Sequence, residues 1–599
     1  MKEYLMKFLP AIPIGIIIST LLFSHSCANT TTPPSGGPKD TIPPLLTGMY
    51  PVIGQTQVPA KKTKLQLKFN EYVVVKDPKG IYLSPPLEKS PLHKIKGKSI
   101  IIRFENDLDS NKTYTLDLTN AIADNNEGNM FPGVTFVFST GDQIDSMVIT
   151  GIVQDCNTLQ PIKGATVMLY RDHADSAVFL KRPDAAVKTD DWGYFCLRNI
   201  KDTLYRMYAV MDENNNNKYD EGGTERIAFI DSLVKPVIVV ADSLPELQKF
   251  DMKDTANCMA RKTEYELNLF KEKPNKQMIV NKERIGERTA YITFMAPYAQ
   301  IDSIWIKGVP KEKLITQFNL VRDSLEIWIN DPRKQPDTLF LNVKYMKTDT
   351  LGNLSSFTEE VKLAKPRTSL IGKSAKKDIK KEDTTAVFTL EAKPETVEQY
   401  GFTLEFKYPV VKTAFDSLVF RSVNPRQQES RGRYIVEQDT LNLRKYTIRP
   451  VDKLQTGWEY FLKIPHRKFK DINGFYNDSL EVKISLPSDD KLSSISLKLT
   501  GVNNKYIVDL LNEKRDQILR SYIVDKDGTF PFPYLKAGKY AIRVTEDNNA
   551  NGIVDTGNLL GHKQPEKVRF YKLQNGQILI DIPEMTELEQ TIDITEMFK

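Results

Sequence analysis

Cysteine and histidine are scarce in this chain, whose 599 residues include four cysteines and five histidines. Four cysteines are too few for the dense disulfide framework of a small secreted scaffold. Two of them, Cys156 and Cys196, could pair in an oxidising compartment or remain two small buried thiols, and both readings stay open. Beyond His25, the histidines are scattered, which argues against a zinc site or a histidine-based catalytic triad. They are His93, His173, His466 and His562.

An excess of one charge is also missing. The chain has 83 basic and 77 acidic residues and a formal net charge of +6. Nucleic-acid-binding proteins usually concentrate basic charge, so we expect no nucleic-acid partner. The nucleophile motif Gly-x-Ser-x-Gly and the zinc-protease motif His-Glu-x-x-His are both absent from the sequence. Acidic residues are spread out without the clustered partners that tune a catalytic pKa, and we therefore expect a protein that is not an enzyme.

The N-terminus has the architecture of a signal peptide, which we place at residues 1–26. An apolar run over residues 8–23 follows two lysines, and it is short for a membrane span. Cys27 comes directly after, in a segment that resembles the lipobox of bacterial lipoproteins, although Ser24 and His25 depart from the usual pattern. The resemblance implies that Cys27 is acylated and anchors the protein in the outer membrane. Ordinary cleavage near Cys27 is the alternative.

Short runs of alternating apolar and polar residues dominate the rest of the chain. Examples are residues 65–69, 99–104 and 114–118, and turn-forming Asn, Asp, Gly and Pro separate such runs. This pattern predicts an all-β protein, a serial array of antiparallel β-sandwiches. A strand, a turn with Asp, Gly and Asn, and a second strand recur in three places. The turn residues are Asp124, Gly128 and Asn129, then Asp349, Gly352 and Asn353, then Asp471, Gly474 and Asn477.

Segments of the sequence resemble two known types of domain. Residues 41–142, with Phe69-Asn70-Glu71, Tyr114-Thr115-Leu116 and Phe138-Ser139-Thr140-Gly141, resemble the bacterial Ig-like domains of Bacteroidota surface lipoproteins. Residues 146–255, with Pro161–Leu169 and Thr189–Phe195, resemble carboxypeptidase-regulatory-like, transthyretin-like sandwiches, which carry no peptidase activity. The expected domains are a tether (27–42), an Ig-like domain (43–142), a regulatory-like sandwich (146–255), an Ig-like sandwich (256–366), a basic linker (367–382), an Ig-like sandwich (383–488) and a C-terminal transthyretin-like copy (489–599).

Two loops place oxygen-bearing side chains at positions 1, 3, 5 and 9, the spacing with which a calcium loop begins. The candidate ligands are Asp212, Asn214, Asn216 and Asp220 in the first loop, and Asp547, Asn549, Asn551 and Asp555 in the second. Position 6 must turn sharply, and Asn217 and Gly552 can both adopt a positive φ.

The bidentate Glu that an EF-hand has at position 12 is missing, because Gly223 and Asn558 stand there. Glu221 or Glu225 could replace it in the first loop, and no obvious residue does so in the second. The spacing predicts Ca²⁺ as a ligand, more firmly for the loop that contains Gly552. The alternative is a self-organised hairpin held by Asx turns.

These features together favour binding or scaffolding at the outer membrane through an envelope protein partner. A surface adhesin or glycan-binding module is one alternative, and an accessory lipoprotein of an outer-membrane assembly or export complex is another. Asp followed by Ser or Thr and an apolar residue recurs, as at residues 231–233, and resembles the O-glycosylation sequon of Bacteroidota exported proteins. Ordinary turn chemistry explains the same pattern. The side of the membrane that the protein faces stays open.

Overall fold

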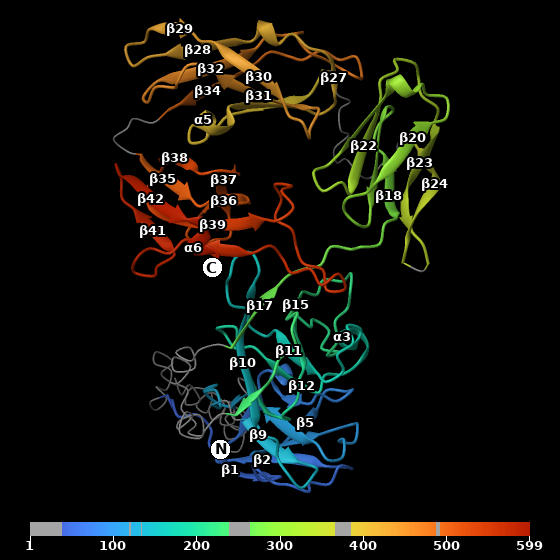
Figure 1. The fold of residues 1–599 in the computed structure, drawn as a ribbon, viewed down its shortest axis with the longest axis vertical. Helices are drawn as coiled ribbons and strands as arrows, with labels where there is room; N and C mark the ends of the chain where they lie inside the picture. The colour runs from blue at the N-terminus through green and yellow to red at the C-terminus, as the bar shows by residue number, and fades with distance from the viewer. Residues whose placement is uncertain are drawn as a thin grey trace, which may run out of the picture. The chain divides into compact units, whose positions relative to one another are not determined.

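The computed structural model describes residues 39–118, 121–132, 135–238, 264–350, 352–365, 385–486 and 492–599. Within these ranges the predicted all-β class is confirmed: strands form five sandwiches, and the α-helices α3 (Ala177–Leu180), α5 (Val397–Tyr400) and α6 (Ile594–Met597) have four residues each (Figure 1). No helix among the described residues is long and apolar enough to cross a membrane. The first sandwich belongs to one compact unit of the chain, and the other four belong to a second unit.

Alternation of apolar and polar residues builds each sandwich from the sequence upward. In strand β2 (Lys64–Phe69), Leu65, Leu67 and Phe69 are buried while the residues between them are exposed. Successive side chains of a strand point to opposite faces, so a two-residue period turns one face into core. The first, third, fourth and fifth sandwiches each enclose a hydrophobic cluster of their own.

The first, third and fourth sandwiches share one topology. When the main strands of each sandwich are counted in chain order, leaving out the short extra strands, strands 1, 2, 5 and 4 are neighbours in one sheet and strands 3, 6 and 7 lie in the other. In the first they are β1 (Leu46–Tyr50), β2, β6 (Ser99–Arg103) and β5 (Leu92–Lys96) against β4 (Tyr82–Ser84), β7 (Thr113–Asp117) and β9 (Thr135–Ser139), with a short pair β3 (Val73–Val75) and β8 (Ile122–Asp124). In the third they are β18 (Ile279–Arg284), β19 (Thr289–Phe294), β22 (Ser324–Ile329) and β21 (Leu314–Phe318) against β20 (Ile301–Ile306), β23 (Thr338–Thr348) and β24 (Leu354–Ala364). In the fourth they are β25 (Phe388–Glu391), β26 (Phe402–Phe406), β31 (Lys445–Pro450) and β30 (Tyr434–Gln438) against β28 (Val419–Val423), β32 (Glu459–Ile464) and β34 (Leu480–Ser485), with an added edge strand β29 (Glu429–Arg431) and a short pair β27 (Val410–Lys412) and β33 (Lys470–Asp471).

A tyrosine contact repeats between the first and fourth sandwiches. The Tyr114 hydroxyl accepts a hydrogen bond from the backbone N–H of Asp109 at 2.7 Å. The Tyr460 hydroxyl accepts one from the backbone N–H of Gln455 at 2.5 Å. In both cases the tyrosine reaches back five residues, the kind of contact known as a tyrosine corner in Ig-like sandwiches.

The second and fifth sandwiches share a different topology. Counted in chain order within each sandwich, main strands 3, 2, 5 and 6 form one sheet and main strands 4, 1 and 7 form the other. In the second they are β12 (Ala185–Lys188), β11 (Thr166–Tyr170), β14 (Arg206–Val210) and β15 (Ile227–Phe229), then β13 (Tyr194–Ile200), β10 (Met147–Asp155) and β17 (Tyr265–Leu269), with β16 (Val237–Ile238) also on β10. In the fifth they are β37 (Ile518–Val524), β36 (Lys505–Leu511), β39 (Gly538–Asp547) and β40 (Val568–Phe570), with β41 (Leu579–Ile582) also on β39, then β38 (Gly528–Leu535), β35 (Ser493–Thr500) and β42 (Glu587–Asp593).

The last strand of each of these two sandwiches pairs in parallel with the first. β17 pairs with β10 from Gly151 to Asp155, as β42 pairs with β35 in the fifth. The structure thereby corrects one expected boundary. Residues 265–269 complete the second sandwich, whereas the sequence analysis began the third sandwich at residue 256. A parallel partner is remote in sequence, so strand alternation alone does not reveal it.

The fifth sandwich contacts the second although the two are far apart in sequence. The Phe270 ring, which follows β17, lies against Gly557, where an added Cβ would come within 2.6 Å of that ring. The Thr556 hydroxyl donates to the carbonyl of Lys271 at 2.7 Å, and Glu272 accepts the N–H of Leu559 at 2.6 Å. The segment after β17 therefore joins the second sandwich to the loop between β39 and β40.

We predict that Gly151→Ala destabilises the second sandwich. A Cβ at this position would lie 2.4 Å from the carbonyl oxygen of Tyr265 and 2.6 Å from the Phe195 ring. Overpacking of this kind costs about 1–3 kcal/mol. Hydrogen–deuterium exchange should show faster exchange in β10 and β17. Gly48→Ala is the control, because nothing lies within 4 Å of a Cβ there. Equal exchange in wild type and Gly151→Ala would contradict the packing described.

Candidate cation-binding loops

The two predicted calcium loops occupy the same place in the two related sandwiches. Residues 212–220 lie between β14 and β15, and residues 547–555 run from the last residue of β39 into the connection to β40. In each case the flanking strands are antiparallel neighbours in one sheet. The repeated spacing in the sequence thus corresponds to one repeated connection in the fold.

The first loop is organised around Asp212. Its Oδ1 accepts the N–H of Asn216 at 3.1 Å and its Oδ2 accepts the N–H of Asn217 at 2.8 Å. The side-chain amides of Asn214 and Asn216 both donate to Oδ2 of Asp220, at 2.6 and 3.0 Å. The side chains at positions 3, 5 and 9 therefore converge on one point.

The second loop repeats this arrangement. Asp547 accepts the N–H groups of Asn551 at 3.0 Å and Gly552 at 2.7 Å. Asn549 and Asn551 donate their amides to Oδ2 of Asp555. Gly552 has φ = 75° and its counterpart Asn217 has φ = 57°, so the predicted turn at position 6 is confirmed.

A buried glutamate at each loop was not fully anticipated from the sequence. Glu225 accepts the N–H of Asp220 at 3.0 Å, and Glu566 accepts the N–H of Asp555 at 2.8 Å. These glutamates are 5% and 4% exposed. Each stands two residues before the next strand, β15 or β40, and this shared offset is the signal that identifies Glu566 as the counterpart of Glu225.

A third acidic turn, at Asp124, is held by hydrogen bonds from its own main chain. Asp124 accepts four backbone N–H groups, from residues 126 to 129, at 2.6–2.9 Å. Burial opposes ionisation, but these hydrogen bonds outweigh it and lower the pKa of Asp124. By contrast, burial raises the pKa of Asp212 and that of Glu225. Burial also raises the pKa of Glu566 in the second loop and that of Asp471 in the turn of the fourth sandwich, so the direction of these shifts does not set the first loop apart.

No three acidic, histidine or cysteine side chains within the described ranges are grouped as a metal site on their own. A cation in either loop would therefore need amide and main-chain oxygens as well. Cys27 lies outside the described residues. Cys156 and Cys196 are both thiols, and burial raises the pKa of the Cys156 thiol to about 12.

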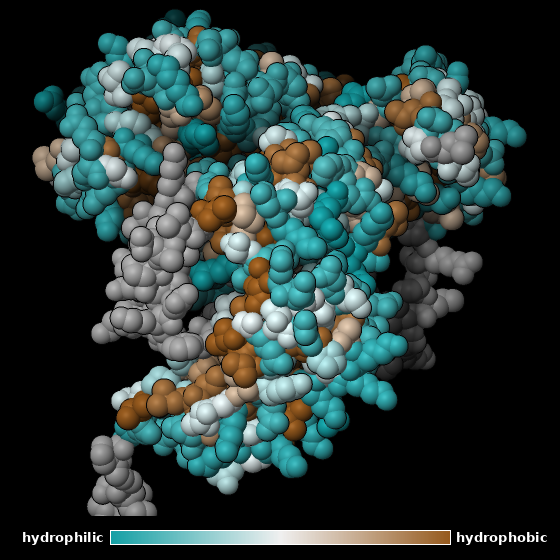
Figure 2. Space-filling view, turned by 60° about the horizontal axis from the view of Figure 1, so that its bottom comes forward, coloured by the Kyte–Doolittle hydropathy of each residue, from teal (hydrophilic) through white to brown (hydrophobic). Residues whose placement is uncertain are grey.

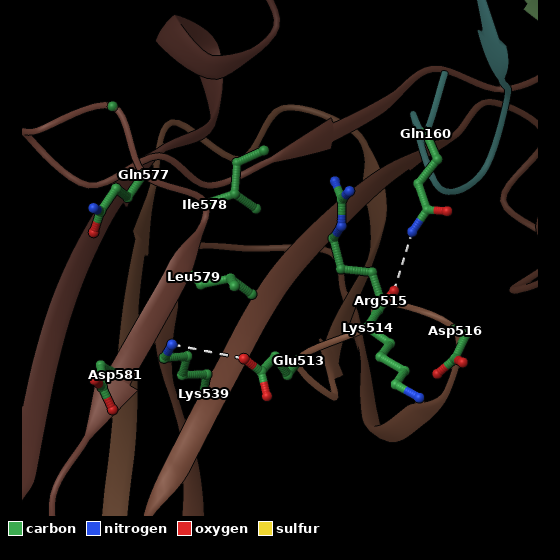
Figure 3. A pocket seen from close by; sticks show the side chains of 11 residues that line it. Gln160, Glu513, Lys514, Arg515, Asp516, Lys539, Gln577, Ile578, Leu579 and Asp581 are labelled. Carbon is green, nitrogen blue, oxygen red and sulfur yellow. Dashed lines mark hydrogen bonds and ion pairs between the residues drawn. The ribbon is translucent and has the colours of Figure 1, made fainter. Parts of the chain in front are cut away.

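An open pocket of about 1010 Å³ lies where the fifth sandwich meets Gln160 of the second. Lys514, Arg515 and Lys539 line it together with Glu513, Asp516 and Asp581, so its charge is mixed. Asp516 and Asp581 lie on opposite sides of the view in Figure 3, while Glu513 is paired with Lys539 at 3.6 Å. These carboxylates do not converge on a common point.

The model of the bacterial Ig-like domain family matches residues 40–140. No protein with a curated description matches the chain. Among solved structures, the N-terminal part of the bacterial S-layer protein SbsC is 12% identical with a TM-score of 0.14, over 33% of this chain and 45% of that one. This chain thus spans less than half of that S-layer structure. The major pilin subunit BcpA of Bacillus cereus is 10% identical with a TM-score of 0.13, over 75% of this chain and 99% of that one. Scores this low carry no inference about function.

We predict that Asp124→Asn speeds amide exchange in residues 126–129 several-fold at neutral pH, because the charged acceptor of four N–H groups is lost. Because the pKa of Asp124 is lowered in the folded state, the stabilisation that its carboxylate gives the turn is complete above the unfolded pKa of about 3.9. This stabilisation is lost as the pH falls through the folded pKa. The exchange ratio of variant to wild type should therefore stay constant from pH 7 to 5 and approach one in stronger acid. Asp77→Asn, at another Asp turn of the same sandwich, is the control. A ratio of one at pH 7 would contradict the assignment.

Proposed function

We propose that this chain is a lipid-anchored, non-catalytic protein of the bacterial cell envelope that binds or scaffolds partners at the outer membrane. One observation carries the proposal: the match to the bacterial Ig-like domain model begins at residue 40, shortly after an apolar N-terminal run, Cys27 and a stretch rich in Pro, Gly, Ser and Thr. A lipid on Cys27 would hold the first sandwich close to the membrane. The sandwiches that follow would then present binding surfaces.

Two histidines of the described residues are paired with aspartates. His466 faces Asp478 at 3.4 Å and His562 faces Asp175 at 3.0 Å. Such pairs resemble the base and acid of a triad, but no serine or cysteine of the described residues hydrogen-bonds to either imidazole. Without a nucleophile at the second ring nitrogen, neither pair is arranged for acyl transfer.

Exposed apolar residues give the sandwiches surfaces for partners. The face in Figure 2 is largely hydrophilic, with apolar residues gathered in patches. Near the start of the first sandwich, Ile42, Leu45 and Val52 are each more than half exposed. Contiguous apolar patches on soluble proteins mark interaction sites, which supports a protein partner in the envelope.

A glycan is the second candidate ligand, and one feature of the third sandwich favours it. Trp305 on β20 and Phe340 on β23 project outward from neighbouring strands, with exposures of 42% and 36%. Asn342 stands opposite Trp305, and Lys362 lies over the Phe340 ring at 5.9 Å. Aromatic faces beside amide and ammonium donors suit a sugar ring and its hydroxyls.

We predict that Cys27→Ser moves the protein from the membrane fraction to the soluble fraction, because two or three acyl chains supply the anchoring free energy at about 0.8 kcal/mol per buried CH₂. Fractionation of cells followed by immunoblotting measures this. Cys196→Ser is the matched control and should remain with membranes. A Cys27→Ser protein that still partitions fully with membranes would refute the lipid anchor.

We predict further that Trp305→Ala reduces retention of the purified chain on a glycan array at least tenfold, because the stacking face is removed. Trp192→Ala is the control, because Trp192 is also exposed, at 51%, and lies on the second sandwich. If no glycan is retained by wild type, crosslinking in the native envelope should instead capture a stable protein partner. A chain that retains no glycan and captures no partner would contradict the proposed function as a whole.

A further inference from the structure

We propose that the outward face of one sheet of the first sandwich docks on a lipid surface whose headgroups carry negatively charged phosphates. The sheet consists of β1, β2, β6 and β5 in that order, drawn in blue in Figure 1. The proposal rests on the lipid anchor of the proposed function. It adds a second contact with the membrane, which is electrostatic and belongs to the folded protein.

Strand register places five basic side chains on this face. Core residues alternate with exposed ones in β2, and the same holds in β6, where Ile100 and Ile102 are buried. Residues directly opposite each other in antiparallel strands point to the same face of a sheet, so the exposed positions continue from strand to strand. The exposed basic residues at these positions, which we call the basic face, are Lys64, Lys68, Lys94, Lys96 and Arg103.

No negative charge balances the basic face. The four strands of this sheet contain no acidic residue. Glu105, two residues beyond Arg103, is already paired with Lys89 at 2.7 Å. The chain as a whole is nearly balanced, with 83 basic and 77 acidic residues. The basic face is therefore a local concentration of charge, and it calls for an anionic partner outside the sandwich.

The arrangement of these charges opposes the stability of the sheet. Lys64 stands directly opposite Arg103, and like charges in such cross-strand pairs are destabilising. Lys68 and Lys96 both stand opposite Ser99, one on each side of it. A local choice that works against the fold without an evident compensating gain is expected at functional sites. An anionic surface laid on this face would remove the repulsion.

The path of the chain identifies that surface as lipid. β1 is an edge strand of this sheet, and only residues 28–45 separate it from Cys27. At full extension, residues 28–38 span at most about 40 Å. Attraction between the basic face and charged headgroups acts within about 10 Å at 0.1 M salt, so it needs a tether that keeps the sandwich near the membrane. An acyl chain on Cys27 supplies that tether.

Each edge of the face adds an apolar side chain. Tyr50 on β1 stands opposite Gln66, and Leu92 on β5 stands opposite Arg103. Both are about half exposed, at 51% and 52%. Tyrosine has an apolar ring and a polar tip, which suits the headgroup region of a membrane. Binding to a lipid surface grows with buried apolar area as well as with charge, so these residues support the same partner.

Vesicle sedimentation of the full chain without its signal peptide tests the proposal. Every protein in the assay carries Cys27→Ser, so that no acyl chain contributes to binding. This parent protein should bind phosphatidylcholine vesicles that contain about a third phosphatidylglycerol at least tenfold more tightly than pure phosphatidylcholine vesicles. Raising NaCl from about 0.1 M to about 0.5 M should weaken the binding several-fold, because salt screens exposed charges.

Neutralising four lysines of the basic face should lower the affinity for the anionic vesicles at least tenfold. This variant combines Lys64→Gln, Lys68→Gln, Lys94→Gln and Lys96→Gln. Because the substitutions relieve repulsion, its melting temperature should be no lower than that of the parent. The matched control removes the same charge from exposed lysines of the third sandwich and should keep the affinity of the parent within about twofold. It combines Lys282→Gln, Lys307→Gln, Lys311→Gln and Lys334→Gln.

Three results would overturn the proposal. They are equal affinity of the parent for neutral and anionic vesicles, unchanged binding by the folded variant of the basic face, and an equal loss of binding in the matched control. The lipid anchor is tested separately by fractionation of cells that carry Cys27→Ser. High salt during that fractionation removes an electrostatic contact and leaves an acyl anchor in place, so the failure of one claim is distinguishable from the failure of the other.

Discussion

Carboxylates that accept main-chain N–H groups hold together the connections on which these sandwiches depend. Where an antiparallel strand ends, its N–H groups lose their ladder partners and need another acceptor. Asp124 supplies it in the first sandwich, Asp349 in the third and Asp471 in the fourth, where it accepts the N–H of Phe475 at 3.0 Å. The strand pairs, and the cores between them, stay in register because these short side chains set the turns.

The sequence was sufficient to predict those features of the fold whose physical cause is local. The Asp, Gly and Asn turns at residues 124–129, 349–353 and 471–477 were predicted from their composition, and Gly128, Gly352 and Gly474 all have φ between 81° and 94°. The all-β class followed from two-residue alternation. The turn at position 6 of both acidic loops followed from the short polar or absent side chain there. Each of these features is decided within a few residues of chain.

Contacts between residues that are far apart in sequence were not predicted. β17 joins the second sandwich through a parallel pairing more than a hundred residues from β10 in sequence. Lys273 reaches Asp555 across 282 positions, and only the fold brings them together. Glu566 lies too far from Asp547 for any loop motif to include it. The two acidic loops look alike in sequence, and the residues that reach the second loop from elsewhere in the fold, such as Lys273 and Tyr298 at Asp555, cannot be read from the loop itself.

The contact of the fifth sandwich with the second has a mechanical consequence. The chain leaves the second sandwich after β17, forms the third and fourth sandwiches, and returns to the place it left, at Phe270 and Gly557. A protease that nicked one backbone bond in the third or fourth sandwich would leave two fragments still held to each other by the Phe270–Gly557 junction. The two fragments would thus stay associated under native conditions and would separate only in denaturant.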